Sequence, residues 1–221
     1  MDDLGLASDL VTDVCTAVSE ISTNVFAHAY GGRARLVTSP VGLPELRLHL
    51  RGRRSELVVT AFDTAPWRGP CPGSPSRPDA DAESGRGLEI VDALCRELRG
   101  AWGVRRSRAR LGGVAVSGKA VYFAAPLPGG LPATRLPPPP GCHAATRLVE
   151  DELLVRGIGP VHRCEGWGMA VLSVRAEITL WARGNGLLLT APSTGTVRYP
   201  FEDVAELAEI IVQSNEELDA R

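Results

Sequence analysis

The sequence is poor in aromatic residues, has a single lysine and contains no long apolar run. Aromatic residues make up 5% of the 221 residues, and Lys119 is the one lysine among 24 basic residues. No apolar stretch approaches the ~18 residues that a membrane-spanning helix needs. With 44% hydrophobic and 23% charged residues, the composition is that of a soluble globular protein, which excludes membrane, fibrous and wholly disordered classes. The first residues lack the basic segment and apolar core of a secretory signal, so we expect a cytoplasmic protein with no membrane partner.

Cysteine content and net charge exclude further classes. The chain has five cysteines, no two closer than 22 residues, so neither a disulfide framework nor a CxxC metal pair is present and we expect reduced thiols. The net charge is −2. Residues 1–130 carry 16 basic and 14 acidic side chains, a balance of +2, and the remainder carries 8 and 12, a balance of −4. An asymmetry this small does not indicate direct nucleic-acid binding.

Proline and glycine divide the chain into two parts. The 24 glycines and 17 prolines concentrate at 66–78 and 126–141. The second stretch contains four successive prolines, which favour an extended spacer. We therefore predict an amino-terminal domain over 1–126, a Pro/Gly-rich linker over 127–141 and a second domain over 142–221.

The apolar pattern of the amino-terminal domain predicts an α+β fold. Residues 8–29 have the 3.6-residue period of an amphipathic helix. Residues 45–51 and 56–63 alternate across a short polar loop, as in an antiparallel hairpin. A second helix is expected over 88–98 and a strand over 119–124. The predicted class is α+β, a two-layer sandwich of helices on a mainly antiparallel sheet. The buried face of the first helix is expected to hold Leu10, Val14, Ala17, Val18, Ile21 and Val25.

The pattern of the second domain also indicates a small α+β unit, and no catalytic constellation is recognisable in it. A helix is expected over 203–218, with Asp203 and Glu206 as a capping pair at its start. Strands are expected over 167–174, 177–183, 187–191 and 196–199. The aromatic residues expected in the core are Trp167, Trp181 and Tyr199.

Three polar residues of the first helix, Glu20, Asn24 and His28, follow one another at a spacing of four. This spacing makes a ladder that slants into the apolar face, so polar side chains occupy the rim of a surface that should be buried. Buried polar groups need partners, which makes the ladder a candidate site. A polar helix edge satisfied by backbone or water is the alternative for this segment.

A carboxylate and a glycine-rich turn lie at the ends of two other predicted elements. Asp63 ends an otherwise apolar strand, either as a functional carboxylate or as an ordinary turn residue. The loop 66–84 after it is longer than ordinary connections and is typical of a disordered segment or a mobile lid. It is followed by Gly85, Arg86 and Gly87, directly before a helix, where free amides and the helix dipole suit phosphate. The turn has neither the GxGxxG nor the GK[ST] spacing.

Taken in order, these pieces resemble the histidine-kinase-like (GHKL) ATPase domain, in particular that of anti-sigma-factor serine/threonine kinases and related actinobacterial ATP-binding regulatory proteins. The resemblance rests on four ordered blocks and covers about residues 8–126. The blocks are Glu20-x-x-x-Asn24-x-x-x-His28, the strand ending in Asp63, Gly85-Arg-Gly87-Leu88-x-Ile-Val-Asp92, and Trp102-Gly103-Val104 followed by Gly118-Lys119.

The resemblance implies a site for ATP and Mg²⁺ between the helices and the sheet. Asn24 would hold the Mg²⁺ that bridges the phosphates, and Glu20, one turn earlier, would act as general base on the attacking hydroxyl. Asp63 would accept a hydrogen bond from the adenine amino group, and the glycine-rich turn would cover the phosphates. The implied nucleotide-binding residues are Asn24, His28, Asp63, Gly85, Arg86, Gly87 and Lys119, where His28 is a nucleotide-binding or a packing residue and Arg86 and Lys119 supply charge beside the phosphates.

The resemblance implies a protein serine/threonine kinase that transfers the γ-phosphoryl group of ATP to an anti-sigma-factor antagonist, or sequesters a sigma factor, or does both, as a homodimer. The alternative is a non-catalytic binding module or switch with a degenerate nucleotide pocket. Two departures favour it, because Ala65 and Ala120 stand where relatives often have glycine and threonine. Relatives also carry a strand and a helix before the first helix, so either the true start lies upstream of Met1 or this fold is incomplete.

An arginine-rich stretch lies between residues 96 and 110, with only Glu97 opposing it. A solvated edge is one interpretation, and docking of an acidic partner or of nucleic acid is the other. Aromatic residues do not interleave as they do in single-strand nucleic-acid binders. The arginines are Arg96, Arg99, Arg105, Arg106, Arg108 and Arg110.

Overall fold

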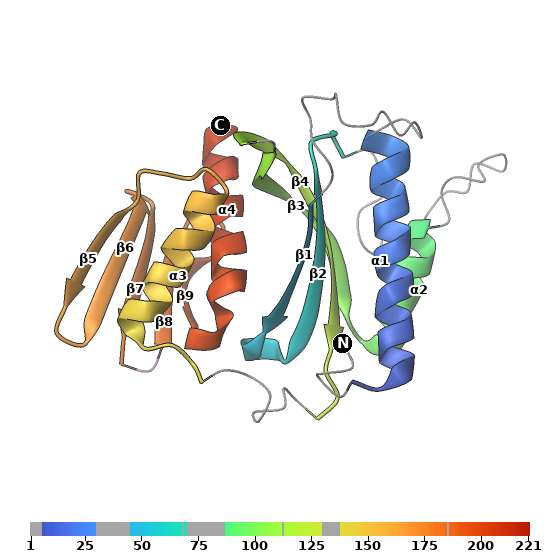
Figure 1. Cartoon of the computed structure of the whole chain (residues 1–221), viewed down its shortest axis with the longest axis horizontal. Helices are drawn as coiled ribbons and strands as arrows, with labels where there is room; N and C mark the ends of the chain where they lie inside the picture. Colours follow the sequence, from blue (N-terminus) through green and yellow to red (C-terminus); the bar gives the residue numbers. More distant parts are fainter. Residues whose placement is uncertain are drawn as a thin grey trace.

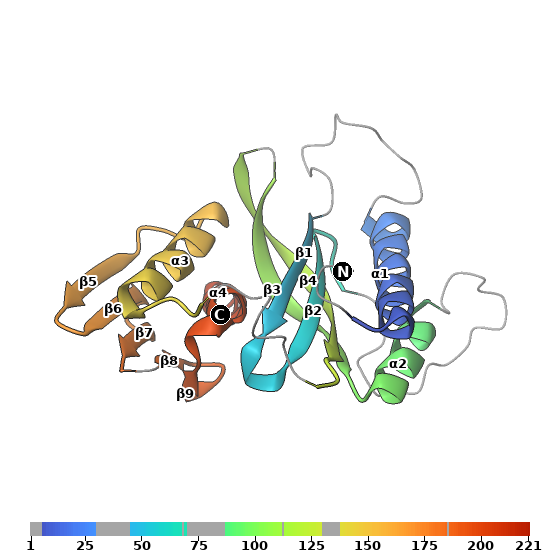
Figure 2. The same cartoon turned by 60° about the horizontal axis from the view of Figure 1, so that its bottom comes forward.

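Helices and antiparallel sheets alternate in four layers (Figure 1). The structure, a computed structural model, describes residues 6–29, 45–67, 69, 87–111, 113–129, 138–184 and 186–221. The layers are a helix pair, a four-stranded sheet, a second helix pair and a five-stranded sheet, called here the first and second sheets (Figure 2). The predicted α+β class is confirmed. Within the described ranges, no helix is both long and apolar enough to cross a membrane.

Helix α1 (Ser8–Ala29) has the predicted bounds and buries the predicted face. It packs together with α2 (Gly87–Leu98) on one face of the first sheet, where the side chains of all three elements form one apolar core. On α1 this core contains Leu10, Val14, Ala17, Ile21 and Val25 as buried residues and Val18 as a partly buried one. Amphipathic periodicity therefore predicted this layer correctly.

The first sheet has the strand order β1-β2-β4-β3, and all its neighbouring strands are antiparallel. The turn η2 (Gly52–Arg54) joins β1 (Glu45–Arg51) to β2 (Glu56–Asp63), as the hairpin pattern predicts. β4 (Val114–Pro126) extends beyond the predicted strand at both ends. The remaining strand, β3 (Ala101–Leu111), lies where no strand was predicted, because arginines on both of its faces hide the alternation of apolar and polar residues.

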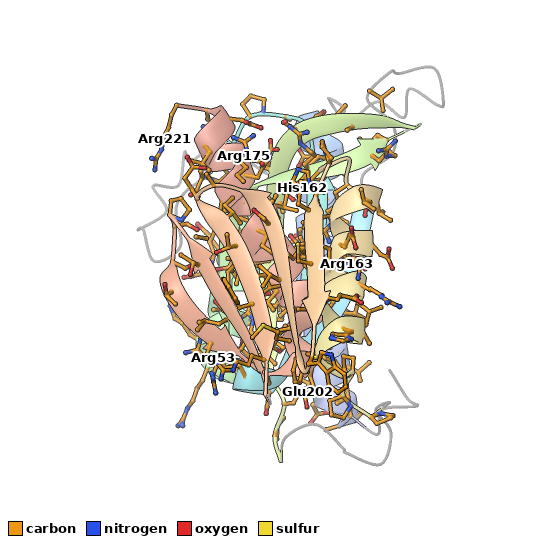
Figure 3. The ribbon with its side chains drawn as sticks, turned by 90° about the vertical axis from the view of Figure 1, so that its left-hand side faces the viewer. Arg53, His162, Arg163, Arg175, Glu202 and Arg221 are labelled. Carbon is orange, nitrogen blue, oxygen red and sulfur yellow. The ribbon has the colours of Figure 1, made fainter. Side chains whose placement is uncertain are left out.

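The second sheet is a five-stranded antiparallel meander in the order β5-β6-β7-β8-β9. Helices α3 and α4 cover one face of it, and the apolar core lies between them and the sheet. Figure 3 looks onto the opposite face, which no described helix covers. Helix α3 and strand β5 were not predicted. The bounds are α3 (Cys142–Val155), β5 (His162–Gly166), β6 (Met169–Arg175), β7 (Ile178–Arg183), β8 (Gly186–Ala191), β9 (Gly195–Tyr199), η3 (Phe201–Asp203) and α4 (Val204–Asp219).

The first sheet with α1 and α2 is called here the first unit, and the second sheet with α3 and α4 the second unit. The aromatic residues of the second unit differ from the prediction. Tyr199 is buried, as predicted, but Trp167 is fully exposed in the β5–β6 turn and Trp181 is 44% exposed. Register explains Trp181, because its neighbours Leu180 and Ala182 take inward positions of β7 and leave the tryptophan on the uncovered face. Side-chain size alone therefore predicted burial wrongly.

Helix α4 lies between the two sheets and presents a different face to each (Figures 1 and 2). Its apolar face, with Leu207 and Ile211 fully buried, belongs to the core of the second unit. Its acidic face meets the arginine-bearing strands β1 and β3 of the first sheet, where Glu206 and Glu209 are both buried. Residues 202–219 contain seven acidic side chains and no lysine or arginine. The first sheet is therefore covered on both faces.

Part of the arginine-rich stretch forms the contact between α4 and the first sheet, which is called here the joint. Arg105 contacts Glu209, and Arg108 donates from Nε to Glu216 Oε1 at 2.6 Å. Arg96 instead pairs with Asp92 on its own helix. The acidic partner weighed from the sequence thus exists for part of the stretch, and it is a helix of the same chain.

The predicted capping pair at the start of α4 is wrong. Asp203 makes no side-chain hydrogen bond to the helix. Its carboxylate accepts hydrogen bonds from the backbone N–H groups of Gly52 and Arg53 in the η2 turn of the first unit. Glu206 accepts a hydrogen bond from Arg51 at 3.0 Å. Residues with the spacing of a local cap therefore connect two parts of the chain that are distant in sequence.

Glu209 is 1% exposed and is contacted by three arginines. Its carboxylate lies 3.1 Å from Arg47 Nη1 and 3.1 Å from Arg105 Nη2, and it also contacts Arg156. The Arg105 contact is an ion pair without hydrogen-bond geometry. Burial alone would raise the pKa of Glu209, but the charges of Arg105, Arg156 and Arg47 outweigh it and lower the pKa from 4.5 to about 2.

We predict that Glu209→Gln destabilises the protein by about 3–5 kcal/mol at neutral pH, because it leaves buried arginines without their counter-charge. The free energy of unfolding would be measured by urea denaturation followed by circular dichroism. The exposed Glu202→Gln is the matched control and should change it by no more than about 0.5 kcal/mol.

The Glu209→Gln substitution should also change how the free energy of unfolding depends on pH. Because folding lowers the pKa of Glu209, its stabilising contribution is complete above pH 4.5 and is lost as the pH falls toward about 2. Wild-type stability should therefore fall more steeply than that of Glu209→Gln over this range. If the free energy of unfolding changed with pH in parallel for the two proteins, the arginines would not be what keeps Glu209 ionised in the folded state.

Candidate functional site

Asp63 is a buried carboxylate at the carboxyl-terminal end of β2, with only 2% of its surface exposed. Its Oδ1 atom accepts a hydrogen bond from the backbone N–H of Ala65 at 2.8 Å and one from the Lys119 ammonium. Its Oδ2 atom is buried and finds no hydrogen-bond partner among the described residues. A buried acceptor without a donor is costly, so Oδ2 is suited to a donor from outside the chain.

Lys119 lies directly opposite Asp63 in the β2–β4 register. Its Nζ atom contacts Asp63 Oδ1 and donates to the carbonyl oxygen of Ala65 at 2.7 Å. The ammonium group therefore holds the Asp63 carboxylate and the residues after it in one arrangement. This is where the structure places the lysine for which the sequence predicted a role beside the phosphates.

Gly118 allows the backbone of Asp63 to approach β4 closely. A Cβ atom at this position would meet the carbonyl oxygen of Asp63 and would lie 2.8 Å from the Phe62 ring. Gly118 thus leaves room for the backbone of Asp63, and Lys119 binds the Asp63 side chain.

The polar ladder of α1 faces the first residue of α2. A Cβ atom at Gly87 would lie 2.6 Å from Glu20 Oε2 and 3.2 Å from Asn24 Nδ2. The Asn24 Nδ2 atom is buried and has no hydrogen-bond partner in the described part of the chain. Three of the predicted site residues therefore meet at the start of α2, where the side-chain nitrogen of Asn24 is left without a partner among the described residues.

The end of β2 and the carboxyl-terminal end of α1 point the same way in the layered unit (Figure 1). The structure thus orients the Asp63 end of the sheet and the later turns of α1 toward one side of the molecule. The side chain of His28, and Gly85 and Arg86 entirely, lie outside the described residues, as does most of the predicted lid over 66–84.

Two residues of the sequence blocks have a structural role. Asp92 in α2 accepts a hydrogen bond from the Trp102 indole nitrogen at 3.0 Å and also pairs with Arg96. This contact fastens α2 to β3.

Ala120 is one of the two departures noted in the sequence. It is next to Lys119 on β4, so its side chain lies on the opposite, α4 side of the sheet, away from Asp63.

Comparison with known proteins agrees with this geometry. Residues 1–110 match the family model of the histidine kinase-like ATPase domain. The match and the α+β arrangement of helices on an antiparallel sheet support a GHKL-type ATPase domain in the amino-terminal half of the chain, and such domains bind ATP, usually with Mg²⁺. Neither the curated proteins nor the solved structures include a significant match to the chain.

We predict that Gly118→Ala destabilises the protein by about 1–3 kcal/mol, because the added methyl group meets backbone and an aromatic ring rather than a flexible side chain. Urea denaturation measures the change. Gly166→Ala is the control, since a Cβ atom at this exposed strand position meets only Met169 Cγ, at an ordinary contact distance of 3.6 Å. Equal stability of the two variants would contradict the close approach of Gly118 to Asp63.

Proposed function

We propose that the chain is an ATP-binding regulatory protein whose nucleotide site lies between α1, α2 and the first sheet. The observation that supports this most directly is the Asp63 carboxylate, which is buried, held by Lys119 and Ala65, and has one oxygen without a partner. An exocyclic amino group is a donor of the kind that this oxygen lacks. In this proposal Asp63 Oδ2 accepts a hydrogen bond from the adenine of ATP.

The residues at the α1–α2 contact are proposed to serve the phosphate end. Asn24 supplies an amide oxygen, which suits a hard cation such as Mg²⁺ that keeps several waters and binds phosphate oxygens. Gly87 begins α2, whose free amides and dipole favour negative charge. Gly85 and Arg86, which lie outside the described residues, and the side chain of His28 complete the proposed site. Bound Mg²⁺ would neutralise phosphate charge during phosphoryl transfer.

For the reaction we propose transfer of the γ-phosphoryl group to a serine or threonine of a partner protein. Glu20, one helical turn before Asn24, is the proposed general base and accepts the proton of the attacking hydroxyl. An anti-sigma-factor antagonist as substrate, sequestration of a sigma factor, a cytoplasmic location and a homodimer are parts of this proposal that follow from the family resemblance.

A second candidate function is a non-catalytic nucleotide switch, and one observation favours it. Glu20 Oε2 lies close to Gly87, so the carboxylate is directed at the start of α2. A base must reach the hydroxyl of its substrate, and from this position Glu20 would have to move away from α2 first. In the switch, Asp63 and Asn24 keep their binding roles and Glu20 has none in chemistry.

We predict that Mg-ATP raises the melting temperature of the wild-type protein, because a ligand that binds only the native state stabilises it by mass action. The shift should be lost in Asp63→Asn and reduced in Asn24→Ala. Thermal unfolding with and without Mg-ATP measures it. The exposed Asp9→Asn on α1 is the control and should keep the full shift. No shift of the wild-type protein at saturating Mg-ATP would end the proposal.

Phosphoryl transfer separates the two candidate functions. If the chain is a kinase, Glu20→Ala should abolish transfer of labelled γ-phosphate to a co-encoded partner protein while the Mg-ATP shift remains. Loss of about 100-fold or more is expected for removal of a general base. Binding of ATP without transfer by the wild-type protein would favour the switch.

A further inference from the structure

A pocket of about 230 Å³ lies at the joint between the two units. It is on the α4 side of the first sheet, whereas Asp63 faces α1 and α2. Four arginines of the first unit, Arg51, Arg53, Arg54 and Arg105, line it, and the second unit contributes Asp203 and Glu206. Because its walls come from both units, the pocket exists only while they are docked.

Guanidinium groups outnumber carboxylates four to two around this pocket, and both carboxylates are engaged by the framework. Asp203 accepts backbone hydrogen bonds from the η2 turn, and Glu206 bonds Arg51 and His49, each at 3.0 Å. Within the described ranges, neither Arg53 nor Arg54 forms an ion pair with a carboxylate. Arg51 pairs with Glu56 as well as with Glu206, and Arg105 pairs with Glu209, so the positive excess of the pocket rests on Arg53 and Arg54.

Two tyrosine rings hold arginines in place at the pocket. The Arg53 guanidinium lies over the Tyr199 ring at 5.4 Å, and that of Arg105 lies over Tyr122 at 5.3 Å. Figure 3 shows Arg53 at the same end of the molecule as Glu202, where the η2 turn meets η3. An arginine oriented by a ring loses less entropy when it binds an anion, so these contacts preorganise the site.

We propose that this pocket binds a small organic oxyanion, carried by either a phosphate monoester or a polycarboxylate. The planar guanidinium fork matches both groups through paired hydrogen bonds. The pocket is smaller than the ~300–1,000 Å³ typical of drug-sized ligands, so the ligand has few carbon atoms. Contacts to both units mean that the ligand stabilises their docked arrangement. This site is separate from the proposed ATP site and shares no residue with it.

The test is calorimetric titration of the full chain with glycerol phosphate and, separately, with citrate, each against sodium chloride of equal ionic strength. At least one of the two should bind, and the pair shows which oxyanion is preferred. Arg53→Ala/Arg54→Ala should weaken binding by about tenfold or more. The control Arg99→Ala/Arg183→Ala removes two exposed charges away from the pocket and should leave binding within about twofold.

A second variant distinguishes a pocket from a charged surface. Gln213 also lines the pocket from α4, and Gln213→Trp should fill the space while keeping all four arginines, so that binding is lost. If that variant does not fold, the comparison of Arg53→Ala/Arg54→Ala with Arg99→Ala/Arg183→Ala decides whether the pocket is the binding site. The proposal is overturned if neither probe binds, if both arginine pairs weaken binding equally, if Gln213→Trp binds as the wild type does, or if Mg-ATP displaces the probe.

Discussion

The acidic face of α4, buried against the arginines of the first sheet, is the contact on which the placement of the two units depends. Removing these charges from water is costly, and the cost is offset only where each carboxylate meets its guanidinium partners. Glu209 meets three of them and Glu206 meets Arg51 and His49. Sliding α4 by one turn would bury unpaired charge, so the contact selects one docking position more sharply than an apolar surface would.

The first sheet carries a different set of side chains on each face, because side chains alternate between the two faces along every strand. On β4, Lys119 points toward α1 and α2 and holds Asp63, while the adjacent Ala120 lies on the α4 side. On β3, Arg106 is exposed on the helix side and Arg105 is buried in the joint. The proposed nucleotide site takes Asp63 from β2 and Lys119 from β4, whereas strands β1, β3 and β4 line the oxyanion pocket. The two sites therefore share strand β4 but no side chain.

Local periodicity was sufficient for the elements that bury one face against a single layer. The bounds of α1, β1 and β2 agree with the predictions because their apolar residues recur at the helical or the strand period. Strand β3 and the capping role of Asp203 could not be predicted in this way. Charged residues that are buried against a distant partner have the same local pattern as a solvated face or a helix cap. Trp181 shows in addition that residue type does not determine which face of a sheet a side chain occupies.

By itself, the sequence determined the α+β class, the polar ladder of Glu20 and Asn24, and Asp63 at the end of a strand, because each of these depends on neighbours within a few residues. Only the tertiary structure decided that Lys119 binds Asp63, that Gly87 meets the ladder, and that the acidic helix lies on the arginines. The physical reason is that ion pairing and close packing join residues 56 or more positions apart, and no local period records such contacts.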